Sequence, residues 1–261
     1  MDQAQAKIAA FLYHDVTDDP TESGFQRRTA LRYKQTREAF ASHLDGIAFS
    51  GLAPDTVSRL NFLEPGRHVL LTFDDGGRGA LHAAEELNRR NWKGHFFITT
   101  GLLGSRTFLN ANHLRYLQSC GHIIGSHSHT HPDIFKAIPY HQMIQEWRTS
   151  SHLLSDLLGV DCVIASVPGG DVSRRVFQSA NEAGLQFLFT SDPILVPRQE
   201  GDCWILGRIC PRTDAPAPQI QRLAELRGWR EALVCNRAKT AVKTFFFPLY
   251  RIYANHALRH P

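Results

Sequence analysis

Seven short apolar runs, separated by amphipathic stretches, limit what this chain can fold into. Flanking Gly, Pro or Asp residues mark the runs as β-strands. The predicted strands are Ile8–His14, His68–Asp75, Gly94–Thr100, His122–Ser128, Cys162–Pro168, Phe187–Ser191 and Cys203–Ile209. The helical period between them predicts helices at Arg37–Ile47, Gly79–Arg90, Asn112–Cys120, Tyr140–Leu158, Ser173–Ala183 and Pro218–Leu226. A strand followed by a helix, repeated along the chain, is typical of an α/β fold with a parallel sheet or barrel.

The composition indicates one large domain. The chain has 261 residues, of which 43% are hydrophobic and 21% are charged, which is enough for a sizeable core. No apolar run is long enough to span a bilayer, and no charged segment precedes an apolar run near Met1. These features predict a cytoplasmic protein. The five cysteines are an odd number without a Cys-x-x-Cys pair, which favours reduced thiols.

The formal charge is unevenly distributed along the chain. The net charge is +4, but residues 227–261 hold seven bases and one acid (7 − 1 = +6), which leaves 22 bases and 24 acids (−2) elsewhere. We therefore predict a domain at 1–226 and a basic, aromatic, helical tail at 227–261. The aromatic residues of this tail are Trp229, Phe245, Phe246, Phe247, Tyr250 and Tyr253. A basic helix with aromatic residues can lie on an anionic membrane, so the tail packs either on the domain or on the inner face of the membrane. The body has no basic stripe, so no nucleic-acid partner is expected.

Two adjacent carboxylates end the second predicted strand, in Thr72-Phe73-Asp74-Asp75-Gly76. Successive strand residues point to opposite faces, so one carboxylate can bind a metal while the other faces the reacting water. The structural alternative is an Asp that caps the helix predicted from Gly79.

Three histidines end the fourth predicted strand, in His127-Ser128-His129-Thr130-His131. Imidazoles four residues apart reach one metal ion if the backbone after His127 turns helically. Together with Asp75 they would leave coordination positions open for water and substrate, as in a catalytic site. Surface histidines without a ligand are the structural alternative.

These two motifs, in this order, resemble those of the NodB-type polysaccharide deacetylases, carbohydrate esterase family 4. The resemblance covers residues 8 to 210 and implies an irregular (β/α) barrel, often seven-stranded, which agrees with the strand count. It implies that Asp74 is the general base. It also implies that Asp75, His127 and His131 bind a divalent metal ion, with zinc expected.

The later motifs depart from the family pattern and indicate a variant branch. Where many members have Arg-x-Pro-Tyr, this chain has Ser166-Val167-Pro168-Gly169-Gly170-Asp171, so Ser166 replaces the arginine that would orient the base. The backbone N–H of Gly169 could still bind the oxyanion, although Pro-Gly-Gly is also a plain turn signal. Residues predicted near substrate or oxyanion are Ser166, Gly169, Gly170, Asp171, His129 and Asp192, the last in a loop resembling a family variant.

The last predicted strand places Arg208 where the family offers a histidine as general acid. Arginine cannot donate a proton at neutral pH, so we predict that Arg208 stabilises charge in the catalytic group. Another residue must then protonate the leaving amine. His14 and His129 are the candidates, although a single histidine at a strand end is often structural.

The predicted activity is metal-dependent removal of an N-acetyl group from an amino sugar, in the biosynthesis of a surface polysaccharide or glycolipid. The expected substrate is an acetylated amino sugar, free, in an oligosaccharide or lipid-linked. One alternative is an O-acetyl esterase or N-deformylase acting on a lipid- or nucleotide-linked sugar. Another is a non-catalytic sugar-binding relative. The absence of a Gly-x-Ser-x-Gly motif disfavours a serine hydrolase.

Overall fold

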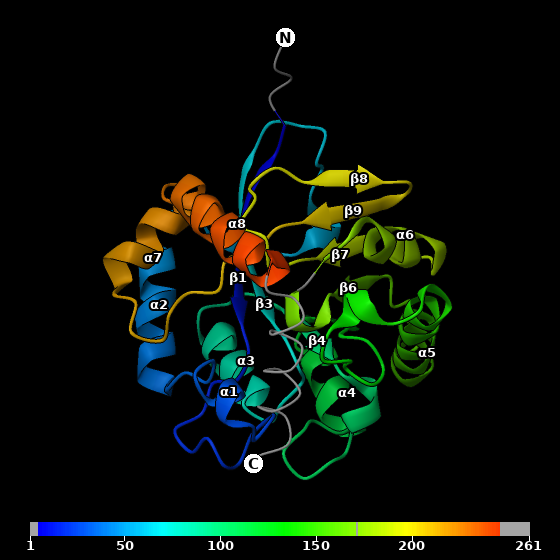
Figure 1. Ribbon diagram of the computed structural model, residues 1–261. Coiled ribbons are helices and arrows are strands. Elements are labelled where there is room, and N and C mark those ends of the chain that lie inside the picture. Colours follow the sequence, from blue (N-terminus) through cyan, green and yellow to red (C-terminus); the bar gives the residue numbers. More distant parts are fainter. Residues whose placement is uncertain (1–4, 171, 246–261) are drawn as a thin grey trace.

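A curled, mainly parallel β-sheet forms the centre of the molecule (Figure 1). The computed structural model describes residues 5–170 and 172–245, with the side chains of 239–245 left out. Within this part the strands are β1 (Lys7–Tyr13), β2 (Pro54–Asp55), β3 (Arg67–Phe73), β4 (His95–Ile98), β5 (Ile123–Ser126), β6 (Ile164–Ser166), β7 (Phe187–Phe189), β8 (Arg198–Glu200) and β9 (Cys203–Leu206). The sheet order is β1-β3-β4-β5-β6-β7-β9-β8, with β2 beside β3.

The two ends of this sheet meet just beyond β9. Phe11 and Ile209 form a parallel bridge, in which the N–H of Leu12 donates to the Ile209 carbonyl at 2.8 Å. The N–H of Ile209 donates in turn to the Ala10 carbonyl at 2.9 Å. The sheet thus curls into an irregular, barrel-like fold, which confirms the predicted fold class, but with β2 and β8 it has nine strands rather than the seven predicted.

Two strands outside this barrel were not predicted. β2 has only two residues and pairs in parallel with Val69 and Leu70 of β3. β8 pairs antiparallel with β9 and consists of the polar residues Arg198, Gln199 and Glu200. Neither segment has the apolar run that marks a buried strand, so hydrophobic pattern alone does not reveal them.

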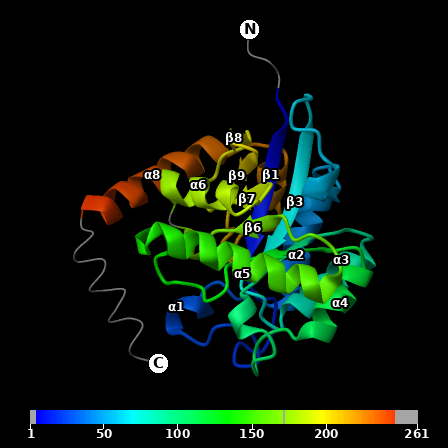
Figure 2. The same cartoon turned by 90° about the vertical axis from the view of Figure 1, so that its right-hand side faces the viewer.

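Helices surround the barrel (Figures 1 and 2). They are α1 (Arg28–Leu31), α2 (Arg37–Phe49), α3 (Ala80–Arg89), α4 (Ala111–Ser119), α5 (Tyr140–Leu158), α6 (Arg174–Glu182), α7 (Ala217–Ala224) and α8 (Trp229–Phe245). Short 3₁₀ helices occupy Val57–Arg59, Thr100–Leu102, Phe135–Ala137 and Pro168–Gly170. The six predicted helices are all present, with ends displaced by at most two residues. α5 matches its prediction at both ends because Gly159, in the left-handed region (φ 69°), stops it.

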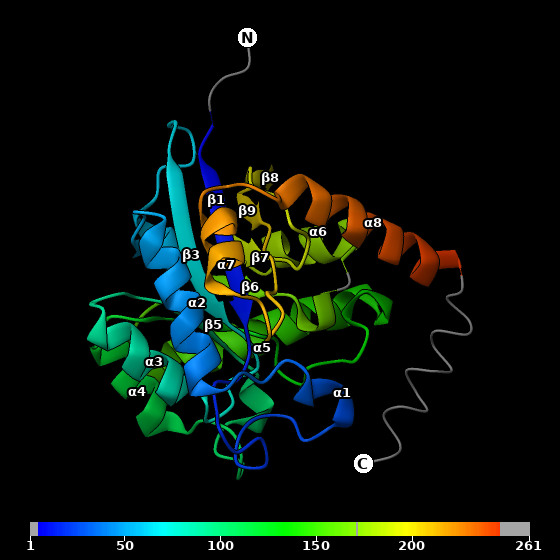
Figure 3. The same ribbon diagram turned by 90° about the vertical axis from the view of Figure 1, so that its left-hand side faces the viewer.

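The C-terminal part of the described chain packs on the barrel. α7 lies beside α2, and α8 follows it (Figure 3). Trp229 is 3% exposed and donates its indole N–H to the Leu223 carbonyl at 2.9 Å. Trp229 is therefore a core residue of the domain. The predicted aromatic residues Phe246, Phe247, Tyr250 and Tyr253 lie outside the described residues. Among the described helices, none has the length and apolar character needed to cross a membrane.

His95 on β4 connects the barrel to the segment after β2. Its Nδ1–H donates to the Leu71 carbonyl at 3.0 Å, and the N–H of Val57 donates to its Nε2 at 2.9 Å. One ring nitrogen donates and the other accepts, and only the neutral imidazole can do both. Burial accordingly lowers the pKa of His95 to about 4.

We expect His95 to make the free energy of unfolding fall as the pH is lowered from about 6.5 to about 4. In this window the unfolded chain binds a proton at His95 and the folded chain does not, so protons favour unfolding. The loss reaches about 3 kcal/mol, at about 1.4 kcal/mol per pKa unit. Urea unfolding of the wild type and His95→Gln at several pH values measures it. Parallel pH curves for the two proteins would contradict the prediction.

Candidate active site

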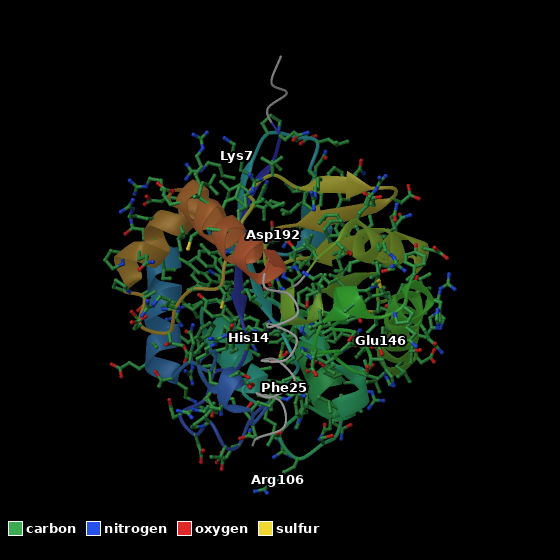
Figure 4. All side chains as sticks on the ribbon, viewed as in Figure 1. Lys7, His14, Phe25, Arg106, Glu146 and Asp192 are labelled. Carbon is green, nitrogen blue, oxygen red and sulfur yellow. The ribbon has the colours of Figure 1, made fainter. Side chains whose placement is uncertain are left out.

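The C-terminal ends of the parallel strands bring the predicted site residues to one rim of the barrel. β3 leads into Asp74 and Asp75, β5 into His127, and β6 ends at Ser166. Arg208 follows β9, and His14, labelled in Figure 4, follows β1. Parallel strands that start together also end together, so residues far apart in sequence meet here.

Asp75, His127 and His131 form the ligand-like group of this rim. Their candidate ligand atoms all lie within 4.8 Å of one another. Asp75 Oδ1 is 3.4 Å from His127 Nε2 and 3.6 Å from His131 Nε2. Asp75 (φ 74°) and His131 (φ 55°) have left-handed backbones, which turn their side chains toward each other.

The surroundings of His127 also suit a metal ligand. Its Nδ1 lies 3.1 Å from the Ser166 carbonyl oxygen and 2.6 Å from Ser166 Oγ. A carbonyl oxygen only accepts, so Nδ1 carries the hydrogen and Nε2 keeps its lone pair for a metal ion. Metal-binding histidines usually have such a partner on the second nitrogen. The three residues therefore fit a divalent cation such as zinc, which prefers imidazole and carboxylate ligands.

The charges of this group are strongly coupled. Burial opposes ionisation of Asp75, but the hydrogen bond from His127 and the electrostatic effect of the nearby histidines hold its pKa well below the usual range. Burial and the neighbouring His127 lower the pKa of His131 to about 4, which keeps this imidazole neutral. For His127, burial is outweighed by the carboxylates of Asp74 and Asp75, so its pKa is raised.

Asp74 is the other carboxylate of the pair, and Arg208 binds it with two parallel hydrogen bonds. Arg208 Nη1 donates to Asp74 Oδ1 at 2.7 Å, and Nη2 donates to Oδ2 at 2.9 Å. The Ser166 hydroxyl donates a third bond to Oδ1 at 3.0 Å. Burial alone would raise the pKa of Asp74, but the Arg208 and His127 charges lower it. Asp74 is therefore an ionised, oriented carboxylate beside the ligand-like group.

Arg208 does not reach the substrate side of the rim, which corrects its prediction as a catalytic group. The side chain is 0% exposed. Its Nε donates to the Thr190 carbonyl at 3.0 Å, and Nη1 also donates to Thr72 Oγ1 at 3.1 Å. The rings of Phe97 and Phe189 lie near its guanidinium carbon, at 5.7 Å and 5.9 Å. Arg208 is a positioning residue that takes the place of the arginine absent from position 166.

Ser166 was predicted near the substrate or oxyanion, and this prediction is also corrected. It is 0% exposed and lies between His127 and Asp74, where it accepts from one and donates to the other. A small hydroxyl suits this place because Arg208 already occupies the space beside Asp74. Ser166 thus links the ligand-like group to the buried carboxylate.

His14 lies at the rim, and its charge contributes to the lowered pKa values of Asp74 and Asp75. Its ring stacks on Tyr33 with centroids 4.9 Å apart. Its Nδ1 is buried and has no hydrogen-bond partner within the described ranges. His14 thus lies close enough to the two carboxylates to influence their ionisation.

The remaining predicted residues are spread around the rim. Gly169 (φ 65°) and Gly170 (φ 70°) form a left-handed turn after β6, and a Cβ on Gly170 would lie 2.6 Å from Ser191 Oγ. His129 has its Nδ1 3.0 Å from Thr100 Oγ1 and is not part of the ligand-like group. Asp192 accepts a bond from Asn236 of α8 at 2.9 Å. Asp171 lies outside the described residues.

Sequence reasoning missed three supporting residues. Thr72 lies two residues before Asp74 on β3, so strand alternation alone would have placed it on the same face. Phe25 packs against the ring of His131, with centroids 4.9 Å apart, and is labelled in Figure 4. Glu146 on α5 binds the loop between the histidines. No local sequence signal connects Phe25 or Glu146 to the site.

The comparison with known families decides the relationship. Residues 64–188, which contain both the Asp pair and the histidines, match the family described as polysaccharide deacetylase. Over this segment the chain is similar to the polysaccharide deacetylases. The match confirms the resemblance noted from the two motifs, and it supports a carbohydrate deacetylase, a hydrolase. No curated protein matches the sequence.

Solved structures of other polysaccharide deacetylases share the fold. IcaB from Ammonifex degensii is 22% identical, with a TM-score of 0.69 over 84% of this chain and 97% of that chain. BC0361, a polysaccharide deacetylase from Bacillus cereus, is 17% identical, with a TM-score of 0.72 over 84% and 69%. The Streptococcus pyogenes deacetylase PplD is 19% identical, with a TM-score of 0.68 over 85% and 99%. At these identities the likeness supports the barrel fold of the deacetylase.

Proposed function

We propose that this deacetylase removes an N-acetyl group from an amino sugar by metal-assisted hydrolysis, in the biosynthesis of a surface polysaccharide or glycolipid. The observation that carries the proposal is the buried Asp74 carboxylate, oriented by Arg208, beside the group formed by Asp75, His127 and His131. The family match and the fold shared with IcaB support an acetylated sugar as the substrate.

In this proposal Asp75, His127 and His131 hold a divalent ion, most naturally zinc. Such an ion supplies Lewis-acid chemistry, which lowers the pKa of a water molecule and polarises the acyl oxygen. The protein orients the ligands for it, since His131 is neutral and the bond from His127 Nδ1 to the Ser166 carbonyl turns Nε2 toward Asp75.

Asp74 is the proposed general base, and its Oδ2 is the atom that takes the proton. Oδ1 already accepts two hydrogen bonds, from Arg208 and Ser166, whereas Oδ2 accepts one, from Arg208. The other side of Oδ2 faces the ligand-like group, with His127 Nε2 at 3.9 Å. A water molecule that attacks the acyl carbon from there would give its proton to Oδ2.

His14 is the proposed general acid. An amine leaves only when its nitrogen is protonated, and Arg208 is buried and fully engaged with Asp74, Thr72 and Thr190. Imidazole is the commonest proton donor in enzymes, and His14 lies at the same rim. For the oxyanion we propose the N–H of Gly169, because the N–H of Gly170 donates to the Val167 carbonyl at 3.3 Å.

Metal content and acetate release, measured together, test this function. We expect the purified wild type to hold a stoichiometric divalent metal and to release acetate from N-acetylated amino sugars. Chelation should abolish the release, and added metal should restore it. Asp75→Ala should lose the metal because it removes the only carboxylate of the ligand-like group. A chelated enzyme that stays fully active would contradict metal dependence, and activity on O-acetyl esters alone would make the protein an esterase.

A further inference from the structure

The turn between the two histidine ligands has a strained backbone. Ser128 (φ 62°) and His131 (φ 55°) both lie in the left-handed region, which residues other than glycine rarely adopt. Each such residue costs about 1 kcal/mol or more and persists only where the surroundings hold it. Something outside the turn must therefore stabilise the conformation that aims His131 at Asp75.

Glu146 on α5 provides most of that support. Its Oε2 accepts hydrogen bonds from the backbone N–H groups of His129 at 2.8 Å and Thr130 at 2.7 Å. Its Oε1 accepts a third bond from the Thr130 hydroxyl at 2.6 Å. Glu146, labelled in Figure 4, lies on α5. One carboxylate thus fixes the two residues that separate Ser128 from His131.

Serine hydroxyls complete the support from within the turn. Ser126 Oγ accepts from the N–H of Ser128 at 3.1 Å, and Ser128 Oγ accepts from the N–H of His131 at 3.0 Å. Every backbone N–H from Ser128 to His131 therefore has a side-chain acceptor, and Glu146 supplies two of the four. Without Glu146, the N–H groups of His129 and Thr130 and the Thr130 hydroxyl would form hydrogen bonds with water instead. The backbone between the two histidine ligands would then leave its left-handed conformation.

We propose that Glu146 is a positioning residue that sets the metal affinity of the site by holding His131 in its ligating orientation before the ion binds. The inference rests on the proposed metal-dependent function. Charge-assisted bonds to backbone N–H groups are stronger than neutral ones, which is why a carboxylate suits this place. When the support is lost, binding of the ion must also order the turn, and the affinity falls by that cost.

Metal titration of chelated Glu146→Gln tests this inference. Glutamine keeps the size of the side chain but replaces the carboxylate by a neutral amide, so the two backbone N–H groups lose their charge-assisted hydrogen bonds. We expect a Kd for zinc about 10–100-fold weaker than that of the wild type, the usual effect of losing a residue that orients a ligand. At saturating zinc, kcat should return to near the wild-type value, because no substrate contact is lost. Asp156→Asn is the matched control, since Asp156 is exposed on the same helix.

The outcomes separate the inference from the proposed function. A wild type that binds no metal overturns both. A wild type that binds zinc while Glu146→Gln binds equally well overturns the role of Glu146 alone. If Glu146→Gln does not fold, Thr130→Val replaces it, because it removes only the hydroxyl bond. We expect a smaller loss of zinc affinity with an unchanged Tm of the metal-free protein, and an unchanged affinity in that variant would overturn the inference.

Discussion

Replacing Arg208 by methionine is expected to destabilise the folded protein by about 3–5 kcal/mol, because it leaves the buried Asp74 carboxylate without its partner. Arg208 and Asp74 are 0% and 4% exposed, and water cannot replace the lost bonds. Methionine fills a similar volume, so the effect comes from the uncompensated charge rather than from a cavity. Urea unfolding of the wild type and the variant at neutral pH measures it.

The double variant Arg208→Met, Asp74→Asn provides the control. Removing both charges should recover a large part of the lost stability, since a buried pair can be exchanged for neutral residues at little cost. Arg208→Lys should be nearly as unstable as Arg208→Met, because an ammonium group cannot make the two parallel bonds to Asp74 Oδ1 and Oδ2. Purely additive effects of the two single substitutions would argue against the pairing as the source of the stability.

The second large effect is expected in catalysis, where His14→Gln and Asp74→Asn should differ in their dependence on the leaving group. Asp74→Asn should lower kcat about 10²–10⁴-fold on both an N-acetyl sugar and an activated acetate ester, because both reactions need the base. His14→Gln should lower kcat by a similar factor on the amide only. An activated alcohol leaves without protonation, whereas an amine does not.

Assays of both variants on a matched amide and ester pair decide this assignment. Thermal unfolding of each variant serves as the control for folding, because His14 also stacks on Tyr33. Equal losses on amide and ester in His14→Gln would mean that His14 acts in another step. Full amide activity in that variant would remove it from the mechanism.

Much of the fold follows from the sequence because the barrel strands are buried on both faces. Buried parallel strands read as short apolar runs, and all seven were placed correctly. The same property brings the two motifs together: Asp74 and His127 each follow a strand, and parallel strands end on one rim. The strand pattern is therefore enough to predict which residues lie near Asp75, except that the position of His131 also depends on the geometry of its turn.

The role of Arg208 could not be predicted from the sequence. Its partner Asp74 is 134 positions away, and the contact depends on how the barrel closes. The sequence places Arg208 at the end of the last strand, but the interior of a barrel lets side chains from several strands reach one carboxylate. Glu146 was missed for a similar reason, because its contacts depend on the packing of α5 against the loop after β5.

The closure of the barrel has a consequence for biosynthesis of the chain itself. Arg208 directly precedes Ile209, the residue that joins the last strand to the first. Until the ribosome has released residue 209, a growing chain has both motifs but lacks the guanidinium that orients Asp74. A chain that ends before Arg208 would hold Asp75, His127 and His131 without the residue that orients Asp74.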